Sequence, residues 1–233
     1  MANITQEDIF AVLKTDGHPW LFYNVFTLLN EELKQLSEHF PSEECSRWLV
    51  LVFGLPIKDL SLWVWHVAED QRYLFANHIL ERTADAVLSY VKSRGVIAID
   101  VAREEARNIS LVELACKAGL GTRGINNLFL HPEFGSWVQL HALLIRSNVE
   151  ASLPVPLLDV CIGCQMCIAA CPADAITQEA FYADRCNRMV ASYWVPKSKA
   201  RAISTSSYVE CHKCISECPI GTLPTSFVGG EVI

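Results

Sequence analysis

Eight of the ten cysteines in this chain lie after residue 160, in two runs that each end in Cys-Pro. The first run begins at Cys161 and has the spacing C-x2-C-x2-C-x3-C-P. The second run begins at Cys211 and has the spacing C-x2-C-x3-C-P, and Cys186 stands alone between the two runs. Closely spaced thiols of this kind are ligands for metal clusters, so metal chemistry is the first prediction from this sequence.

The spacing indicates two 4Fe–4S clusters. A 4Fe–4S cluster takes four thiolates, and in two-cluster ferredoxins the Cys before the Pro ligates the other cluster. Applied here, this rule divides the eight cysteines into two sets of four with none left over. The first set is Cys161, Cys164, Cys167 and Cys218. The second set is Cys171, Cys186, Cys211 and Cys214, and it departs from a duplicated ferredoxin because Cys186 is separated from its run.

Two other uses of cysteine compete with clusters. Zinc sites commonly use two C-x2-C pairs with a longer spacer, which differs from a run of four cysteines followed by Pro. Disulfides are rare in the cytoplasm, where we expect this protein. The remaining cysteines, Cys45 and Cys116, lie outside both sets, and we interpret them as inert thiols that pack in the interior.

A second motif, Gly119-Leu-Gly-Thr-Arg-Gly124, matches the G-x-G-x-x-G pattern of dinucleotide-binding loops. Such a loop must follow a strand and begin a helix, so that the pyrophosphate meets the helix N-terminus. Here the order is reversed, because the segment 109–121 reads as a helix that begins at the N-cap Ser110 and ends at the glycines. The sequence therefore favours a helix terminator and turn over NAD or FAD binding.

The segment 1–150 reads as an α/β sheet domain, and 151–233 as a ferredoxin-like domain with two clusters. Pro154 and Pro156 mark the expected linker between them. Apolar runs predict buried strands, and helical periodicity or capping residues predict helices. The expected strands are 47–56, 95–100 and 136–145, and the expected helices are 5–14, 25–39, 69–94 and 109–121.

Composition and charge exclude several classes of protein. Hydrophobic residues make up 51% of the chain, so it is not intrinsically disordered. The formal net charge is −7, which argues against nucleic-acid binding and makes tRNA an unlikely partner. The N-terminus lacks an apolar signal-peptide core, and charged residues with Gly54 and Pro56 interrupt the most apolar stretch. We therefore expect a cytoplasmic protein without a membrane span.

The chain resembles the epoxyqueuosine reductases and, more distantly, the reductive dehalogenases, which are cobalamin-dependent iron–sulfur enzymes. Four segments carry the resemblance: 117–144 with the glycine loop and GSW, the cysteine run 161–176, "YADRCNRM" at 182–189, and "CHKCISECPIG" at 211–221. The resemblance implies an α+β fold, in which a nitroreductase-like sheet domain precedes the two-cluster domain. It describes a short form without the helical repeats that follow the clusters in epoxyqueuosine reductases.

The resemblance also implies a cobalamin site. By analogy with the family, we expect a corrinoid cavity to be lined by Gly119, Gly121, Gly124, Asn126, Gly135 and Ser136. In epoxyqueuosine reductases an Asp at the end of a strand donates a proton, and the matching residue is Asp100. An Asp in that place is also a common turn or cap residue, so both interpretations of Asp100 stay open.

These features lead to one favoured function and two alternatives. The favoured function is a corrinoid-dependent reductase, in which a ferredoxin or flavodoxin donates electrons through the clusters and a small or medium organic substrate is reduced. One alternative is a ferredoxin-type electron carrier. The other is a protein that binds or reduces a corrinoid for a partner without turnover of its own.

Overall fold

In the computed structural model, the described residues are 4–29, 31–32, 47–68, 71–103, 109–151, 159–193, 202–204, 207–221 and 224. The chain divides into two compact units. Unit 1 comprises 1–55, 79–121 and 140–158, and unit 2 comprises 56–78, 122–139 and 159–233. Two segments that precede the cysteine runs, 56–78 and 122–139, thus group with the cysteine-rich segment. The expected division into domains 1–150 and 151–233 stays a prediction.

Unit 1 contains a four-stranded sheet in the order β1-β2-β8-β5. Its strands are β1 (Phe22–Leu29), β2 (Arg47–Pro56), β8 (Val138–Arg146) and β5 (Ala98–Asp100). The pairs β1–β2 and β5–β8 are antiparallel. Ser147, just after β8, bonds to Arg47 at the start of β2, and Ile57, just after β2, bonds to Trp137 just before β8. β2 and β8 therefore also run antiparallel.

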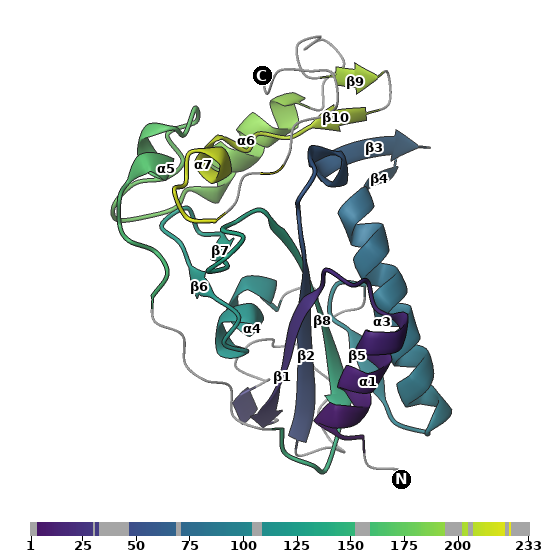
Figure 1. The fold of residues 1–233 in the computed structure, drawn as a ribbon. Coiled ribbons are helices and arrows are strands. Elements are labelled where there is room, and N and C mark those ends of the chain that lie inside the picture. Colours follow the sequence, from purple (N-terminus) through teal and green to yellow (C-terminus); the bar gives the residue numbers. More distant parts are fainter. Residues whose placement is uncertain are drawn as a thin grey trace. The chain divides into compact units, whose positions relative to one another are not determined.

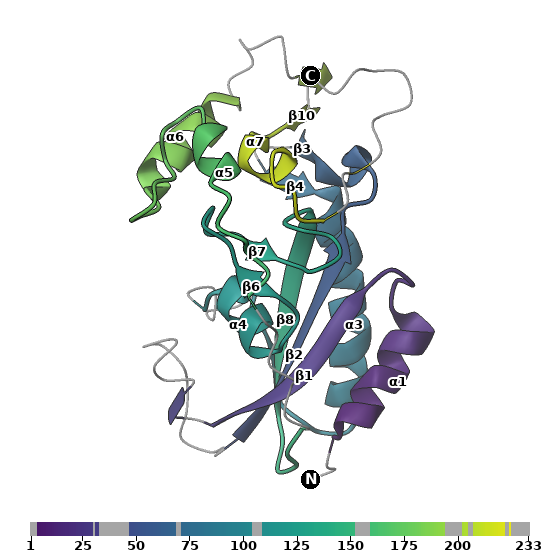
Figure 2. The ribbon, with the colours of Figure 1, turned by 60° about the vertical axis from the view of Figure 1, so that its left-hand side comes forward.

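Three helices accompany this sheet: α1 (Gln6–Asp16), α3 (Phe75–Ser93) and α4 (Leu111–Lys117). The views in Figures 1 and 2 place α1 and α3 on one side of the strands and α4 on the other. α1 begins with a reciprocal capping box between Thr5 and Asp8. α4 begins at Ser110, whose hydroxyl accepts the N–H of Glu113. α3 ends before Gly95, which has φ +70°.

The core of unit 1 consists of aliphatic side chains on these elements. Within unit 1, eight successive residues of β2, Trp48 to Leu55, are buried, and β8 buries Leu143, Leu144 and Ile145 completely. Successive side chains of a strand point to opposite faces of the sheet, so a strand with one face in solvent would have every second residue exposed. An unbroken run of buried residues therefore indicates that both faces of the strand are covered. This is why the continuous apolar run 47–56 predicted a buried strand correctly.

The predicted helix over 25–39 is wrong over 25–29, because 22–29 is strand β1, paired residue by residue with β2, whereas the described residues 31–32 are helical. Residues 22–29 are rich in aromatic and β-branched types, and pairing with β2 outweighs the helical periodicity. The predicted helix over 69–94 begins later, at Phe75, since 71–74 form strand β4. The strand predicted over 47–56 has the predicted ends, and the other helices and strands predicted within 1–150 are present with shifted ends. The expected linker prolines lie outside the described residues.

Unit 2 consists of short elements. A second sheet has the order β4-β3-β10-β9, and β6 pairs with β7. The strands of the second sheet are β4 (Gln71–Leu74), β3 (Val64–Ala68), β10 (Ser207–Val209) and β9 (Ala202–Ser204). The separate pair consists of β6 (Thr122–Arg123) and β7 (Phe129–Leu130). The helices of unit 2 are η1 (Leu60–Trp63), α5 (Met166–Ala169), α6 (Ala183–Tyr193) and α7 (Lys213–Ser216). α5 and α7 pack together, and they carry or adjoin most of the clustered cysteines. Within the described residues, no helix is long and apolar enough to cross a membrane.

Candidate functional site

The loop that contains Cys161 and Cys164 is fixed at its start by two hydrogen bonds. Asp159 Oδ1 accepts the N–H of Cys161 at 3.0 Å, and Thr122 Oγ1 in β6 accepts the N–H of Val160 at 3.2 Å. Gly163 and Gln165 then have left-handed backbones, with φ +68° and +64°. These two residues turn the chain tightly, and α5 follows directly. The cysteines before α5 and Cys167 within it therefore converge.

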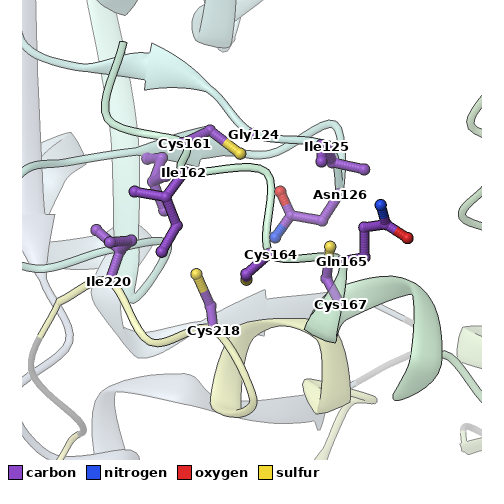
Figure 3. A pocket seen from close by; sticks show the side chains of 11 residues that line it. Gly124, Ile125, Asn126, Cys161, Ile162, Cys164, Gln165, Cys167, Cys218 and Ile220 are labelled. Atoms are coloured by element: carbon purple, nitrogen blue, oxygen red, sulfur yellow. The ribbon is translucent and has the colours of Figure 1, made fainter. Parts of the chain in front are cut away.

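The first cysteine set surrounds one small pocket in unit 2 (Figure 3). Cys161, Cys164 and Cys167 come from the loop and α5, and Cys218 comes from the segment after α7. Apolar or amide side chains and one glycine complete the wall: Gly124, Ile125, Asn126, Leu130, Ile162, Gln165 and Ile220. Four thiols and a largely apolar wall are suited to a metal–sulfur cluster.

The electrostatics of this pocket reflect the proximity of its thiols. Burial raises the pKa of the Cys167 thiol, and the neighbouring Cys218, Cys161 and Cys164 raise it further. Burial likewise raises the pKa of Cys218, with added contributions from Cys164 and Cys161. Thiolates held this close repel one another, and iron cations among them would offset that repulsion.

The second cysteine set is also brought together within unit 2. Burial raises the pKa of Cys186 on α6, and Cys171 and Cys211 are the thiols that raise it further. The pKa of Cys214 is raised to about 12, first by burial and then by the neighbouring thiols, of which the first three are Cys211, Cys186 and Cys171. The lone cysteine before the second run is thus a neighbour of the cysteines with which the spacing grouped it. Cys171 Sγ also accepts the N–H of Ala175 at 3.3 Å.

The segment that carries Cys218 is held by a close contact between two glycines. A Cβ on Gly135 would lie 2.1 Å from the carbonyl oxygen of Ile220, and one on Gly221 would lie 2.1 Å from the nitrogen of Gly135. Gly135 also exchanges two backbone hydrogen bonds with His131 at 2.9 Å. Both glycines have positive φ, +61° and +96°. The backbone at 131–135 therefore supports the chain beside Cys218 at a distance that side chains would not allow.

Two further observations concern the cysteines. None of the nine described cysteines, which include the half-buried Cys116, forms a disulfide, and Cys45 lies outside the described residues. Among the described residues, no group of three or more His, Cys, Asp or Glu side chains is arranged to hold a single metal ion. A 4Fe–4S cluster has a different requirement, since each thiolate binds a different iron and the sulfur atoms stand around the whole cluster.

The residues expected to line a corrinoid cavity fall into three groups: Gly119 with Gly121, Gly124 with Asn126, and Gly135 with Ser136. The first two groups are described here. Gly119 and Gly121 belong to unit 1, where Gly119, with φ +69°, ends α4. Gly124 and Asn126 line the pocket of the first cysteine set. A Cβ on Gly124 would lie 2.6 Å from Asn126 Oδ1, which itself accepts the N–H of Leu128. Gly119 and Gly124 thus have local reasons for being glycine, and the terminator role of Gly119 is the one that the sequence favoured.

Ser136 carries the observation that fits a polar ligand in unit 2. Its hydroxyl is buried and has no hydrogen-bond partner among the described residues. The indole N–H groups of Trp63 and Trp137 have the same property, and their rings meet edge to face at 5.6 Å. Buried donors without a partner are costly, so a ligand rich in acceptors would satisfy them. The acetamide and propionamide oxygens of a corrinoid are acceptors of this kind.

Asp100 lies in unit 1 at the end of β5 and is 1% exposed. Its Oδ1 accepts the backbone N–H groups of Ala102 and Arg103, as in a turn-capping Asp. The same oxygen is 2.9 Å from Nε2 of His141 on β8. Burial raises the pKa of Asp100, but His141, the Ala102 N–H and Arg103 together outweigh burial, so its pKa is lowered.

His141 is the residue that sequence reasoning missed. It is 3% exposed and packs on Phe53, and in the sequence it appears only as one polar residue within the apolar strand 136–145. A lone His in an otherwise apolar strand was the available signal, because a buried imidazole needs a hydrogen-bond partner. The sequence could not identify that partner, since Asp100 is 41 residues away.

A family model described as "4Fe-4S binding domain" matches residues 154–177. The match covers the first cysteine run, including Cys161, Cys164, Cys167 and Cys171. The chain thus contains a 4Fe–4S binding domain, and the prediction of iron–sulfur chemistry is confirmed at this level.

Curated relatives are named epoxyqueuosine reductase. One from Listeria monocytogenes is 38% identical over 71 residues, which is 30% of this chain and 18% of the relative. Another, from Shewanella oneidensis, is 28% identical over 148 residues, which is 60% of this chain and 36% of the relative. This chain therefore spans much less than half the length of these two relatives.

Solved structures of the same two groups share the fold. An epoxyqueuosine reductase with an epoxyqueuosine-modified tRNA stem loop has a TM-score of 0.61 at 17% identity, covering 91% of this chain and 64% of that chain. A catabolic reductive dehalogenase has a TM-score of 0.59 at 13% identity, covering 88% of this chain and 30% of that chain. The fold is therefore established as a mixture of helices and sheets with a ferredoxin-like region.

The expectations about substrate and partner need correction. We expected tRNA to be an unlikely partner and the substrate to be a small or medium organic molecule. Both expectations are wrong, because an epoxyqueuosine reductase of this fold has been solved with a modified tRNA stem loop. The net charge misled, since it sums over the whole surface, whereas phosphate contacts depend on local charge.

The four segments that carry the resemblance point to two groups of proteins. The curated relatives and the solved structures come from those same groups. The chain is therefore similar in sequence to the epoxyqueuosine reductases and similar in fold to both these enzymes and the reductive dehalogenases.

Proposed function

We propose that this protein is an iron–sulfur oxidoreductase that acts on an epoxide-bearing nucleoside in tRNA. The two cysteine sets would hold two 4Fe–4S clusters, and a corrinoid, when bound, would supply low-potential reducing chemistry. Removal of an epoxide oxygen as water consumes electrons and protons together, so the protein must supply both. The tRNA substrate follows from the named relatives, and the electron path follows from the cysteines.

The convergence of the first cysteine set carries this proposal. Cys161, Cys164, Cys167 and Cys218 come from distant parts of the sequence and line one pocket. The pocket is shared with Gly124 and Asn126, which the family resemblance connects with the corrinoid. The second set, grouped around Cys214, supports a second cluster, because a single cluster would leave four adjacent thiols without a metal.

The donors around Ser136 support the corrinoid. Ser136, Trp63 and Trp137 each keep a buried donor without a partner among the described residues. Amide oxygens on the corrin rim would accept these hydrogen bonds. Asp100 is proposed as the group that delivers a proton to the substrate.

The first test measures clusters and corrinoid together. The protein is reconstituted anaerobically with iron and sulfide, incubated with hydroxocobalamin and desalted. We expect about eight irons per chain, retained cobalt, and reduction of an epoxyqueuosine-modified tRNA stem loop with a chemical reductant. Cys164→Ser should lose about four irons, whereas the matched control Cys116→Ser, outside both sets, should lose none.

A second variant tests the corrinoid site without relying on turnover. Ser136→Ala should lower cobalt retention about fivefold, since one hydrogen bond contributes about 1 kcal/mol. Ser93→Ala, on the surface of α3 in unit 1, is the matched control and should leave retention unchanged. Full iron content with no retained cobalt and no reaction on the stem loop would contradict the reductase and favour an electron carrier.

A further inference from the structure

Asn126 lies in the loop of the hairpin that β6 and β7 form, and its side chain is buried. Its Oδ1 accepts the backbone N–H of Leu128 at 3.2 Å. Because a backbone N–H can only donate, this bond requires the oxygen of the amide to face Leu128. The nitrogen Nδ2 is therefore the other branch of the amide, and no described residue accepts a hydrogen bond from it.

This nitrogen faces the pocket of the first cysteine set. Asn126 lines that pocket, and Figure 3 shows its side chain pointing into the space between the four cysteines, with the nitrogen on the inner side. The wall has a second amide, on Gln165, but that side chain is exposed and bonds to Gln178 at 2.7 Å. Asn126 is therefore the residue that presents a buried amide donor to this pocket.

The loop around Asn126 is fixed in place by local contacts. The N–H of Gly124 donates to the carbonyl oxygen of Leu128 at 2.9 Å. A Cβ on Gly124 would lie 2.6 Å from Asn126 Oδ1, so glycine leaves the space that this amide occupies. Thr122 at the start of the hairpin accepts the N–H of Val160, which joins the hairpin to the cysteine loop. The donor is thus held in position before any cluster binds.

A donor at this place affects the energy of reduction. One-electron reduction of a 4Fe–4S cluster adds one negative charge, and hydrogen bonds to its sulfur atoms help to set its potential. The backbone N–H groups of Ile168 and Ile220 bind the sulfurs of Cys167 and Cys218, which opposes the burial that raises the pKa of both thiols. Since no described thiol accepts from Asn126 Nδ2, this nitrogen is left for a sulfide of the cluster itself.

We propose that Asn126 Nδ2 donates a hydrogen bond to a sulfide of a 4Fe–4S cluster held by the first cysteine set, and that this bond raises the reduction potential of that cluster. The inference rests on the function proposed above, because it requires a cluster in this set. Asn126 is a positioning residue, which contacts neither iron nor substrate. It gives up no proton, and the single electron comes from the reductant.

Two substitutions remove the donor in different ways. Asn126→Asp keeps the oxygen that accepts the Leu128 N–H but replaces Nδ2 with a second acceptor, whereas Asn126→Leu removes the donor without adding charge. Asn127→Asp is the matched control, since it makes the same change at a neighbouring residue that is outside the pocket wall and bonds to Arg123. Each protein is reconstituted anaerobically with iron and sulfide, and its reduction is titrated by electron paramagnetic resonance.

We expect Asn126→Leu to lower the equilibrium constant for reduction of one cluster about fivefold, which is a fall of about 40 mV at about 59 mV per tenfold change. Asn126→Asp should lower it at least as far, because a carboxylate adds negative charge. Asn127→Asp should change it less than about twofold, and the potential of the second cluster should stay constant. An unchanged potential in Asn126→Leu, or an equal fall in Asn127→Asp, would overturn the inference.

A spectroscopic measurement covers the case in which the variants bind little iron. With ¹⁵N in the side-chain amide of asparagine, pulsed electron paramagnetic resonance of the reduced wild-type protein should show a ¹⁵N coupling to the cluster. Absence of this coupling would overturn the inference. It would also be overturned if Asn126→Leu kept its potential but retained less cobalt, since the nitrogen would then serve the corrinoid.

The proposed function can fail separately from this inference. If the potential shifts as expected but the wild-type protein does not reduce the modified stem loop, the inference is supported and the proposed function is contradicted. If the wild-type protein takes up no iron at the first cysteine set, both are contradicted.

Discussion

The helices α1, α3 and α4 that cover the sheet of unit 1 have 11, 19 and 7 residues, whereas α5 and α7 of unit 2 have four each. Isolated four-residue helices are not stable in water, and most cysteines beside them are only half-buried. Unit 1 gains its stability from aliphatic burial across β2 and β8. In unit 2, metal–thiolate bonds would take over part of that role, as they do in other small metal-binding domains. The two units should therefore respond to different perturbations.

Removal of iron should give the largest difference between the units. After chelation under reducing conditions, amide hydrogen exchange should accelerate across 161–193 and 207–221 by orders of magnitude, because the cysteine sets lose their common partners. Residues 49–55 of β2 should keep their protection. Equal acceleration in both units would contradict the comparison, since it would make the metal a requirement for the whole fold.

Replacement of single glycines should give the second largest difference between the two units, in stability and in iron content. Gly135→Ala places a Cβ 2.1 Å from the Ile220 carbonyl oxygen, at a position with φ +61°. We expect a loss of about 3 kcal/mol or more and a reduced iron content, since the segment beside Cys218 must move. Gly95→Ala is the matched control, because φ is +70° but nothing lies within 4 Å of the new Cβ. It should cost about 1 kcal/mol and leave iron content unchanged.

A cavity in unit 1 should affect stability without affecting the clusters. Leu51 is fully buried in β2, and Leu51→Ala should lower the free energy of unfolding by about 2–5 kcal/mol. Leu29→Ala, at a position 47% exposed, should change it by less than about 0.5 kcal/mol. Denaturant titrations monitored by circular dichroism give these values, and visible absorbance reports the clusters. A bleached cluster spectrum in folded Leu51→Ala protein would contradict the expectation that packing in unit 1 does not affect the clusters of unit 2.

The buried carboxylate of unit 1 should make its stability depend on pH. Because the folded state lowers the pKa of Asp100, the ionised group stabilises the fold above the ordinary Asp pKa. That stabilisation is lost as pH falls through the lowered pKa. At neutral pH, Asp100→Asn should be less stable than wild type by about 1–3 kcal/mol, and this difference should shrink below about pH 4. A difference independent of pH would mean that the charge on Asp100 does not contribute.

The smallest expected effect is at the start of α1. Thr5→Ala removes the hydroxyl that pairs with Asp8 in the capping box. We expect a loss of about 1 kcal/mol in thermal or denaturant unfolding, with no change in iron content. Thr15→Ala, near the exposed end of the same helix, serves as the control. A larger loss at Thr15 than at Thr5 would contradict the capping argument.

Local patterns predicted much of this molecule. The capping residues Thr5 and Ser110 and the terminator Gly119 act over a few residues, so the helices that they bound could be predicted from the sequence. The cysteine spacing predicted which thiols gather, because ligand geometry constrains the loop directly. The helix expected over 25–39 failed where pairing with β2 determined the conformation of 22–29.

Features that depend on distant pairs were not predictable. The contact of Gly135 with Ile220 and Gly221 joins segments about 85 residues apart, and the bond of His141 to Asp100 joins neighbouring strands. Neither pair leaves a local pattern in the sequence. The expectation that tRNA is an unlikely partner failed for another reason, because it rested on a whole-chain sum of charges, which does not describe the charge of a local surface.

The division of the chain into units has a consequence for how such a protein can evolve. The chain passes between unit 1 and unit 2 at residues 55, 78, 121, 139 and 158, and three of these points fall inside β2, α3 and β8. Neither unit is a continuous stretch of sequence. A single gene fusion or truncation would therefore transfer neither unit intact, and the two must be inherited, duplicated and recombined as one piece.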